Sequence, residues 1–146
     1  MLLTDARAAR REVMQKSLAQ RAGPSPDAHA VAAAATSTWQ QVAGQIGPVI
    51  GVHGFDVLFG RSLHLATATF PWLSPARDVA NATALLASVT ACLEAADAAT
   101  AAEASLALLV TFAEVLATLI GEPLTERLLS PVWLAAAQAS QREIAS

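Results

Sequence analysis

Cysteine and aromatic residues are scarce in this chain. It has one cysteine, Cys92, no tyrosine, and only 5% aromatic residues in total. A single cysteine excludes an internal disulfide and a zinc site built from cysteines. Because Cys92 stands between alanine and leucine, we expect a small buried hydrophobe there rather than a nucleophile. β-Branched residues never alternate with polar ones over the length of a strand, so we expect no β-sheet.

The common catalytic and phosphate-binding motifs are also missing. No serine stands in a Gly-x-Ser-x-Gly context, and no His-Glu-x-x-His motif is present. The segment Gly51–Gly54 lacks the lysine of a phosphate-binding loop and the strand that precedes a dinucleotide-binding turn. The acidic residues form no recognisable acid/base pair. We therefore expect a protein that is not an enzyme, holds no cofactor or metal, and acts by binding.

Lysine is rare and the charge is unevenly distributed. The formal net charge is −3. Residues 1–21 carry five basic and two acidic side chains, whereas residues 94–126 carry six acidic side chains and no basic one. The basic excess at the N-terminus is too small for a typical nucleic-acid-binding surface, so we do not expect a nucleic-acid partner. High alanine and arginine with one lysine favours a bacterial origin with a GC-rich genome.

No charged residue interrupts the segment Ala28–Phe55, which is long enough to cross a membrane. The segment also contains three glutamines, four glycines and Pro48, which are unfavourable in a bilayer. The N-terminus lacks the basic and then apolar order of a secretory signal. We predict no membrane span and a cytoplasmic location.

Alanine dominates what is present, with 35 residues. It has the highest helix propensity and lets helices pack closely. The prediction is an all-α fold: a compact antiparallel helical bundle of about five main helices plus a short helical turn. We expect a basic N-terminal helix or arm at residues 1–22, followed by a single bundle domain at residues 23–146.

Apolar periodicity and capping residues predict where the helices begin and end. Ser-Pro pairs favour helix starts, glycines favour ends, and Thr100–Glu103 has the pattern of a capping box. The predicted elements are a helix at 4–20, a break at Gly23–Pro26, a helix capped by Ser25 that ends or kinks at Gly47-Pro48, a third helix from Pro48 to Thr69, a fourth opened by Ser74-Pro75, a fifth from Thr100 to Gly121, a short turn at 123–129, and a last helix opened by Ser130-Pro131.

The third predicted helix is the most apolar and contains the most distinctive residues. Its core-facing side is predicted to comprise Val52, Phe55, Phe59, Leu63, Ala66 and Phe70, widened by Leu58 and Leu65. Glycines at 44, 47, 51 and 54 have helical spacing. We expect them to form a stripe without side chains, on which another helix or a flat ligand can lie closely.

A narrow strip of polar residues on this helix is not explained by packing. At 100° per residue, His53 and His64 project within about 20° of one line, with Asp56 and Arg61 on its two sides. Trp72 follows in the turn Phe70–Leu73. The candidate binding surface therefore comprises His53, Asp56, Arg61, His64 and Trp72.

Several functions are compatible with this surface. The preferred hypothesis is a regulatory or adaptor module of the signal-transduction type that binds a protein partner, with a homodimer as the default assembly. The first alternative is a sensor whose pocket for a small-molecule ligand lies beside the third helix. Phosphotransfer through His64 is a lesser alternative, because the lysine and glycine that usually follow such a histidine are missing. A further alternative is a cofactor such as haem on the glycine stripe, with His53 or His64 as axial ligand and Trp39, Phe55 and Trp72 lining the pocket. The weakest of these alternatives is a metal shared by His53 and Asp56.

Overall fold

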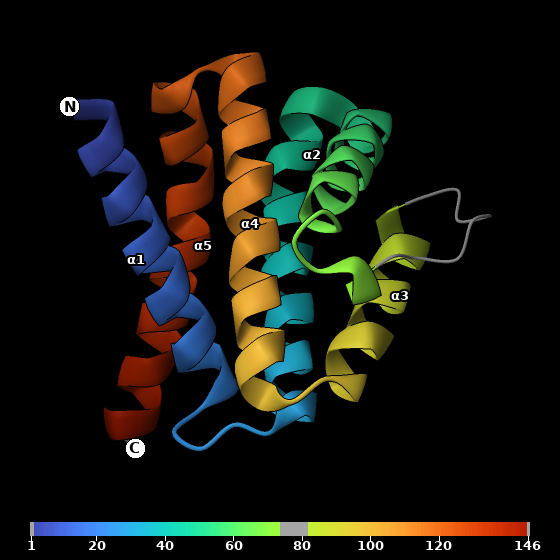
Figure 1. The fold of residues 1–146 in the computed structure, drawn as a ribbon. Helices are drawn as coiled ribbons and strands as arrows, with labels where there is room; N and C mark the ends of the chain where they lie inside the picture. Colours follow the sequence, from blue (N-terminus) through green and yellow to red (C-terminus); the bar gives the residue numbers. More distant parts are fainter. Residues whose placement is uncertain (1, 74–81, 146) are drawn as a thin grey trace.

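The computed structural model describes residues 2–73 and 82–145, and the surroundings of side chains within 8–73 and 83–135. Its elements are α1 (Leu2–Ala22), α2 (Ala28–Ala66), the short 3₁₀ helix η1 (Pro71–Leu73), α3 (Ala82–Ala95), α4 (Ala98–Ile120) and α5 (Glu122–Ala145). No strand occurs in these ranges, which confirms the predicted all-α bundle. In Figure 1, α4 lies between α1 and α5 on one side and α2 and α3 on the other.

The chain reverses within α2, and the residue that allows the reversal is Gly51. Its backbone has φ 83° and ψ 165°, a conformation that is essentially restricted to glycine. Figure 1 shows that the chain turns back within α2. We call residues 28–50 the first arm and residues 52–66 the second arm. The prediction that Gly47-Pro48 would end or kink the helix was wrong, because Pro48 continues the helix and the break follows three residues later.

Aspartates, rather than the predicted Ser-Pro and Thr-x-x-Glu signals, cap the helices. Asp27 accepts a hydrogen bond from the backbone N–H of Ala30 at 2.8 Å and begins α2. Ser25 is therefore not the cap, because the helix begins only after Asp27.

The start of α4 follows the same rule. Asp97 accepts from the backbone N–H of Thr100 at 3.1 Å and from the Thr100 hydroxyl at 2.7 Å. The predicted capping box at Thr100–Glu103 thus lies inside the helix. These hydrogen bonds, with the Thr100 hydroxyl first, lower the pKa of Asp97 because they stabilise its charged form.

The predicted end of α4 is correct, whereas the predicted start of the last helix is not. Gly121 ends α4 as predicted, with its N–H donating to the Ala117 carbonyl. The prediction of a separate turn followed by a helix that begins at Ser130-Pro131 was wrong. α5 is continuous through Pro131, and the Ser130 hydroxyl donates to the Glu126 carbonyl one turn earlier instead of capping a new helix. The Ser74-Pro75 start lies outside the described residues.

An aromatic cluster holds the two arms of α2 against α4. Trp39 of the first arm lies edge-on to Phe59 of the second arm, with ring centroids 4.8 Å apart, and to Phe112 of α4 at 5.1 Å. Phe55 stacks on Phe59 and lies 5.6 Å from Phe112. Such aromatic contacts add about 0.5–1.5 kcal/mol per pair to the burial of apolar area. The cluster thereby fixes the antiparallel pairing of the two arms.

The predicted glycine stripe does not form a close contact. A Cβ atom added at Gly44, Gly47 or Gly51 would meet no atom within 4 Å, and one at Gly54 would meet only the side chain of Ile50. Among the described residues, no other helix approaches these glycines closely enough to require the missing side chains. Of the four glycines, Gly51 is required because of its backbone conformation, and not because another helix packs against it.

Two arginines attach α1 to the rest of the bundle. Arg10 is buried and forms ion pairs with Glu122 and Glu126 of α5. Arg21 donates to the Ser37 hydroxyl, the Gln41 side-chain carbonyl and the backbone carbonyl of residue 132. Burial lowers the pKa of Arg21, because its guanidinium has lost part of its hydration. The predicted division into 1–22 and 23–146 stays a prediction, which the Arg10 variants below test.

Candidate functional site

The second arm of α2 presents a solvent-exposed face. Six of its residues are exposed, and five of them define what we call the outward face: His53, Val57, Arg61, His64 and Leu65. The sixth, Val52, lies about 100° from His53 around the helix and lines a pocket on the flank of the arm. The opposite side of the same arm is buried in the core through Phe55, Phe59 and Leu63. Because successive residues rotate by 100°, the buried aromatic residues determine which side chains point outward.

The five residues of the predicted binding surface do not all lie together in the structure. His53, Arg61 and His64 are exposed and lie on the outward face. Asp56 is half-buried on the flank of the arm and lines a pocket instead. Trp72 lies on η1, where its ring packs edge-on against Phe70 and its side chain stays 36% exposed. Histidines and an arginine thus share one face, whereas Asp56 belongs to a different environment.

The outward face also carries exposed aliphatic side chains beside its polar ones. Val57 is 68% exposed and Leu65 43%. Val52, at the start of the arm, is 74% exposed and lies at the edge of the pocket that Asp56 lines. The prediction that Val52 and Leu65 would belong to the core-facing side was wrong. Val52 is the first residue after the Gly51 break, and Leu65 is the last residue but one of α2, so both lie beyond the middle turns that the neighbouring helices cover. Leu58, in the middle of the arm, is buried as predicted.

A pocket of about 280 Å³ lies between the two arms of α2 and α3. Its walls are mostly apolar and include Trp39, Phe55, Phe59 and Leu86. Its polar lining is provided by Asp56, Gln40 and Thr83. The pocket can hold a small, largely apolar molecule with one or two hydrogen-bonding groups.

The histidine-based alternatives find less support in this geometry. Trp39 and Phe55 line the pocket beside the second arm, whereas His53, His64 and Trp72 do not, so this pocket does not bring together the residues named for a haem. Within the described residues, no group of three or more His, Cys, Asp or Glu side chains is placed to hold a metal ion. His64 is exposed, and phosphotransfer through it stays a prediction.

Sequence reasoning missed Val57, which lies near the centre of the outward face. Its helical angle is only about 40° from His53, so the projection that grouped the histidines also identifies it. It was missed because valine was sought only on the core side. The pocket between α1 and α4, described below, had no sequence signal, since its lining comes from three separate helices.

Two helices are long and apolar enough to cross a membrane by length and composition: α2 and α4. The core helix of a folded domain passes the same test, and much of α4 is buried against its neighbours. The finding is weak evidence for a membrane span, and the predicted absence of one stays a prediction.

No protein-family model, curated protein or solved structure shows a significant match to this chain.

Proposed function

We propose that this protein is a regulatory or adaptor module that binds another protein through the outward face of α2. The observation that carries the proposal is the exposure of two large aliphatic side chains, Val57 and Leu65, beside His53, Arg61 and His64 on one helical face. Single exposed aliphatic residues are normal on protein surfaces, but a group on one helix face is typical of interaction sites.

The composition of the face indicates the chemistry of its partner. The face carries one permanent positive charge, Arg61, two histidines and no acidic residue. An amphipathic helix face of this kind fits a groove with an apolar floor. Acidic side chains at the rim of such a groove would be complementary to Arg61 and would speed association. The proposed partner is therefore a protein with an apolar groove and an acidic rim.

Site-specific photocrosslinking tests this proposal in cells of the source organism. A photoreactive phenylalanine derivative replaces Val57, and a matched variant carries it at Val13. Val13 is also an exposed valine, 41% exposed, but it lies on α1, across α4 from the second arm (Figure 1). We expect one crosslinked protein species from position 57 that is missing from position 13.

The crosslinked protein is then identified, purified and titrated against the wild-type protein and an Arg61→Glu variant. Reversing the charge that faces the acidic rim should weaken binding about tenfold, by both lost attraction and new repulsion. Equal binding of the two proteins would reject the proposed surface. A crosslink only to a second copy of this chain would make the face a dimer contact instead of an adaptor site.

A second candidate function is supported by the pocket between the arms of α2 and α3. A ligand-responsive sensor would bind a small molecule among Trp39, Phe55 and Phe59, with Asp56 at the polar side. Binding to the folded state alone raises the melting temperature. A compound library screened by thermal shift tests this function, with Ala43→Leu as the control because Ala43 lines the same pocket. A hit that shifts both proteins equally binds elsewhere.

A further inference from the structure

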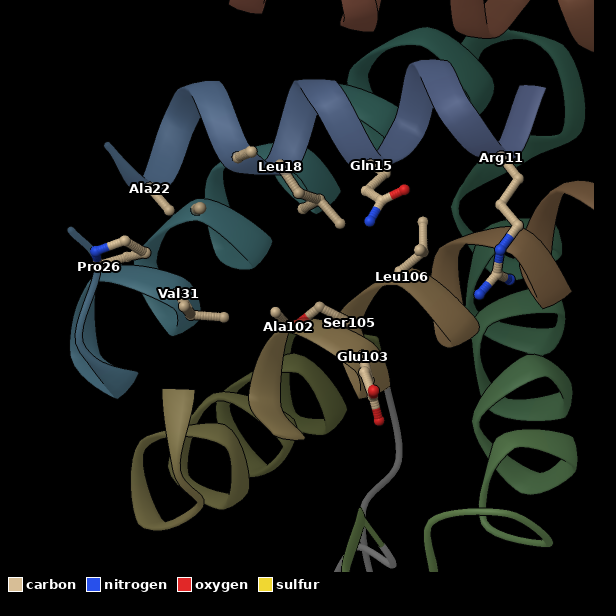
Figure 2. Close-up of a pocket in the computed structure, with 12 residues that line it drawn as sticks. Arg11, Gln15, Leu18, Ala22, Pro26, Val31, Ala102, Glu103, Ser105 and Leu106 are labelled. Carbon is tan, nitrogen blue, oxygen red and sulfur yellow. The ribbon is translucent and has the colours of Figure 1, made fainter. Parts of the chain in front are cut away.

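A second pocket lies on the other side of the molecule, away from the outward face. It has a volume of about 340 Å³ and is formed by α1, the start of α2 and α4. Figure 2 shows Arg11 at one end of the pocket and Ala22 and Pro26 at the other. This volume lies at the lower end of the range of about 300–1,000 Å³ that is typical of pockets for small molecules.

The walls of this pocket are apolar over most of its length. Leu18 of α1, Val31 of α2 and Leu106 of α4 approach it from three helices, and alanines complete the lining. Apolar walls of this kind favour an aliphatic or aromatic ligand body.

A buried hydroxyl gives the second observation. Ser105 is 3% exposed, lines the pocket, and its Oγ has no hydrogen-bond partner among the described residues. In Figure 2 it lies on the side of α4 that faces α1. An unpaired buried hydroxyl is unfavourable, whereas the hydroxyls of Thr38 in α2 and Thr111 in α4 donate to the carbonyl one turn earlier. A ligand atom in the pocket would provide the partner that Ser105 lacks.

The charged and amide groups that line the pocket indicate the sign of the charge on the ligand. Arg11 is exposed and makes no hydrogen bond or ion pair within the described part of the chain. Gln15 lies beside it on α1 and can donate through its amide. Glu103 also lines the pocket, but its carboxylate extends away from α1 in Figure 2. Arg11 and Gln15 thus extend from α1 toward α4, whereas the Glu103 carboxylate extends away from α1 (Figure 2).

We propose that the pocket between α1 and α4 binds a small monocarboxylic acid with an apolar body, for which Arg11 supplies the positive charge and Ser105 a buried hydrogen-bond donor. Arginine matches the geometry of a carboxylate, and a hydrogen bond to a charged group is stronger than one between neutral groups. This site is independent of the proposed partner surface, and it does not depend on the adaptor function.

Octanoate, which has an apolar chain of suitable length, is the probe. Isothermal titration compares octanoate with octanol and octylammonium, all below the concentration at which they aggregate. We expect saturable binding of octanoate, weaker binding of octanol and no binding of octylammonium. Preference for octylammonium would overturn the proposal, because it would place Glu103 rather than Arg11 in control of the site. Absence of saturable octanoate binding at millimolar concentration would overturn it as well.

Four variants locate the binding. Arg11→Gln and Ser105→Ala should each weaken octanoate binding about tenfold, a factor typical of one hydrogen bond to a charged group. Ala102→Phe should block the pocket from an exposed position on α4, where a large side chain leaves the fold intact. Ala43→Leu narrows the other pocket and should leave octanoate binding unchanged. Binding that survives Ala102→Phe, or that Ser105→Ala does not affect, would contradict the assignment.

The melting temperatures of the same variants provide a readout that needs no ligand. Ser105→Ala should leave the unliganded protein as stable as the wild type or more stable, because it removes a buried hydroxyl without a partner. Octanoate should raise the melting temperature of the wild type and not that of Ala102→Phe. Strong destabilisation by Ser105→Ala would show that the hydroxyl has a structural partner, which would contradict the proposal.

Discussion

Replacement of Arg10 by methionine tests whether α1 is an integral part of the bundle. The Arg10 side chain is 4% exposed, and its guanidinium faces two carboxylates from successive turns of α5. Nε donates to Glu126 at 2.7 Å, and Nη2 donates to Glu122. Methionine keeps the length of the apolar stem but removes the charge and both hydrogen bonds.

The loss in the free energy of unfolding that we expect for Arg10→Met lies between two limits. Removing one partner of a fully buried ion pair costs about 3–5 kcal/mol, because the other charge stays buried and unpaired. An exposed pair contributes about 0–1 kcal/mol. The side chains of Glu122 and Glu126 are 31% and 48% exposed, so water can rehydrate both carboxylates when Arg10 is lost. We therefore expect a loss of about 2–3 kcal/mol in the free energy of unfolding.

Urea denaturation followed by circular dichroism measures this loss. A loss of that size corresponds to a decrease in melting temperature of roughly 5–10 °C for a chain of this length. The double variant Arg10→Met with Glu126→Gln should be more stable than the sum of the single effects predicts, because the two groups interact directly. A change below about 0.5 kcal/mol, the range of ordinary surface substitutions, would refute the reasoning and leave α1 as a loosely attached arm.

Three further predictions concern the turn, the core and the pH dependence. Gly51→Ala should destabilise the protein by about 1–3 kcal/mol, because alanine does not readily adopt the backbone conformation of Gly51. Gly44→Ala, in the regular part of the same helix, should instead stabilise it by up to about 1 kcal/mol. Chemical denaturation measures both changes in the free energy of unfolding. Phe59→Ala should cost about 3–5 kcal/mol, and a loss below 1 kcal/mol would show that the aromatic cluster is not the core. Because its pKa is lowered in the folded state, Asp97 contributes stability that is present above the pKa of an unfolded aspartate and lost as the pH falls through the lowered pKa. Asp97→Asn should therefore flatten the dependence of the melting temperature between about pH 5 and pH 2, and an unchanged slope would show that the Thr100 hydrogen bonds do not act on Asp97.

The fold class could be predicted from the sequence because alanine content and apolar periodicity act locally. The buried positions of the second arm, such as Phe55, Phe59 and Leu63, follow from the same periodicity. The end of α4 at Gly121 was also predicted, since glycine at that position relieves a backbone constraint. These features depend on interactions within one helix.

The errors arose where several local signals competed or where neighbours decided the outcome. Ser25 and Asp27 can both cap α2, and the charged carboxylate is the one that accepts the hydrogen bond from Ala30. Ser130-Pro131 resembles a helix start, but the surrounding turns of α5 continue through it. The exposure of Val52 depends on where other helices end, which no local pattern encodes.

The candidate surface was only partly accessible from the sequence. The helical projection grouped His53, Arg61 and His64, and these residues do lie on one exposed face. Asp56 was grouped with them although it faces the neighbouring pocket, because the projection gives an angle but not the position of the adjacent helix. Val57 was missed for the converse reason: its hydrophobic side chain suggested the core, and the buried aromatic cluster turns it outward.

The central claim, that the outward face of α2 binds a protein partner, is tested most directly by Val57→Asp. The crosslinked partner, once identified and purified, is titrated against wild type and variant by calorimetry, with Val13→Asp as the matched control. At 68% exposure, Val57 contributes little to the core, so Val57→Asp should unfold within about 0.5 kcal/mol of the wild type. We predict that Val57→Asp weakens partner binding at least about tenfold while Val13→Asp does not, because a charge would be desolvated and placed against an acidic rim. Equal affinities for all three proteins would contradict the account.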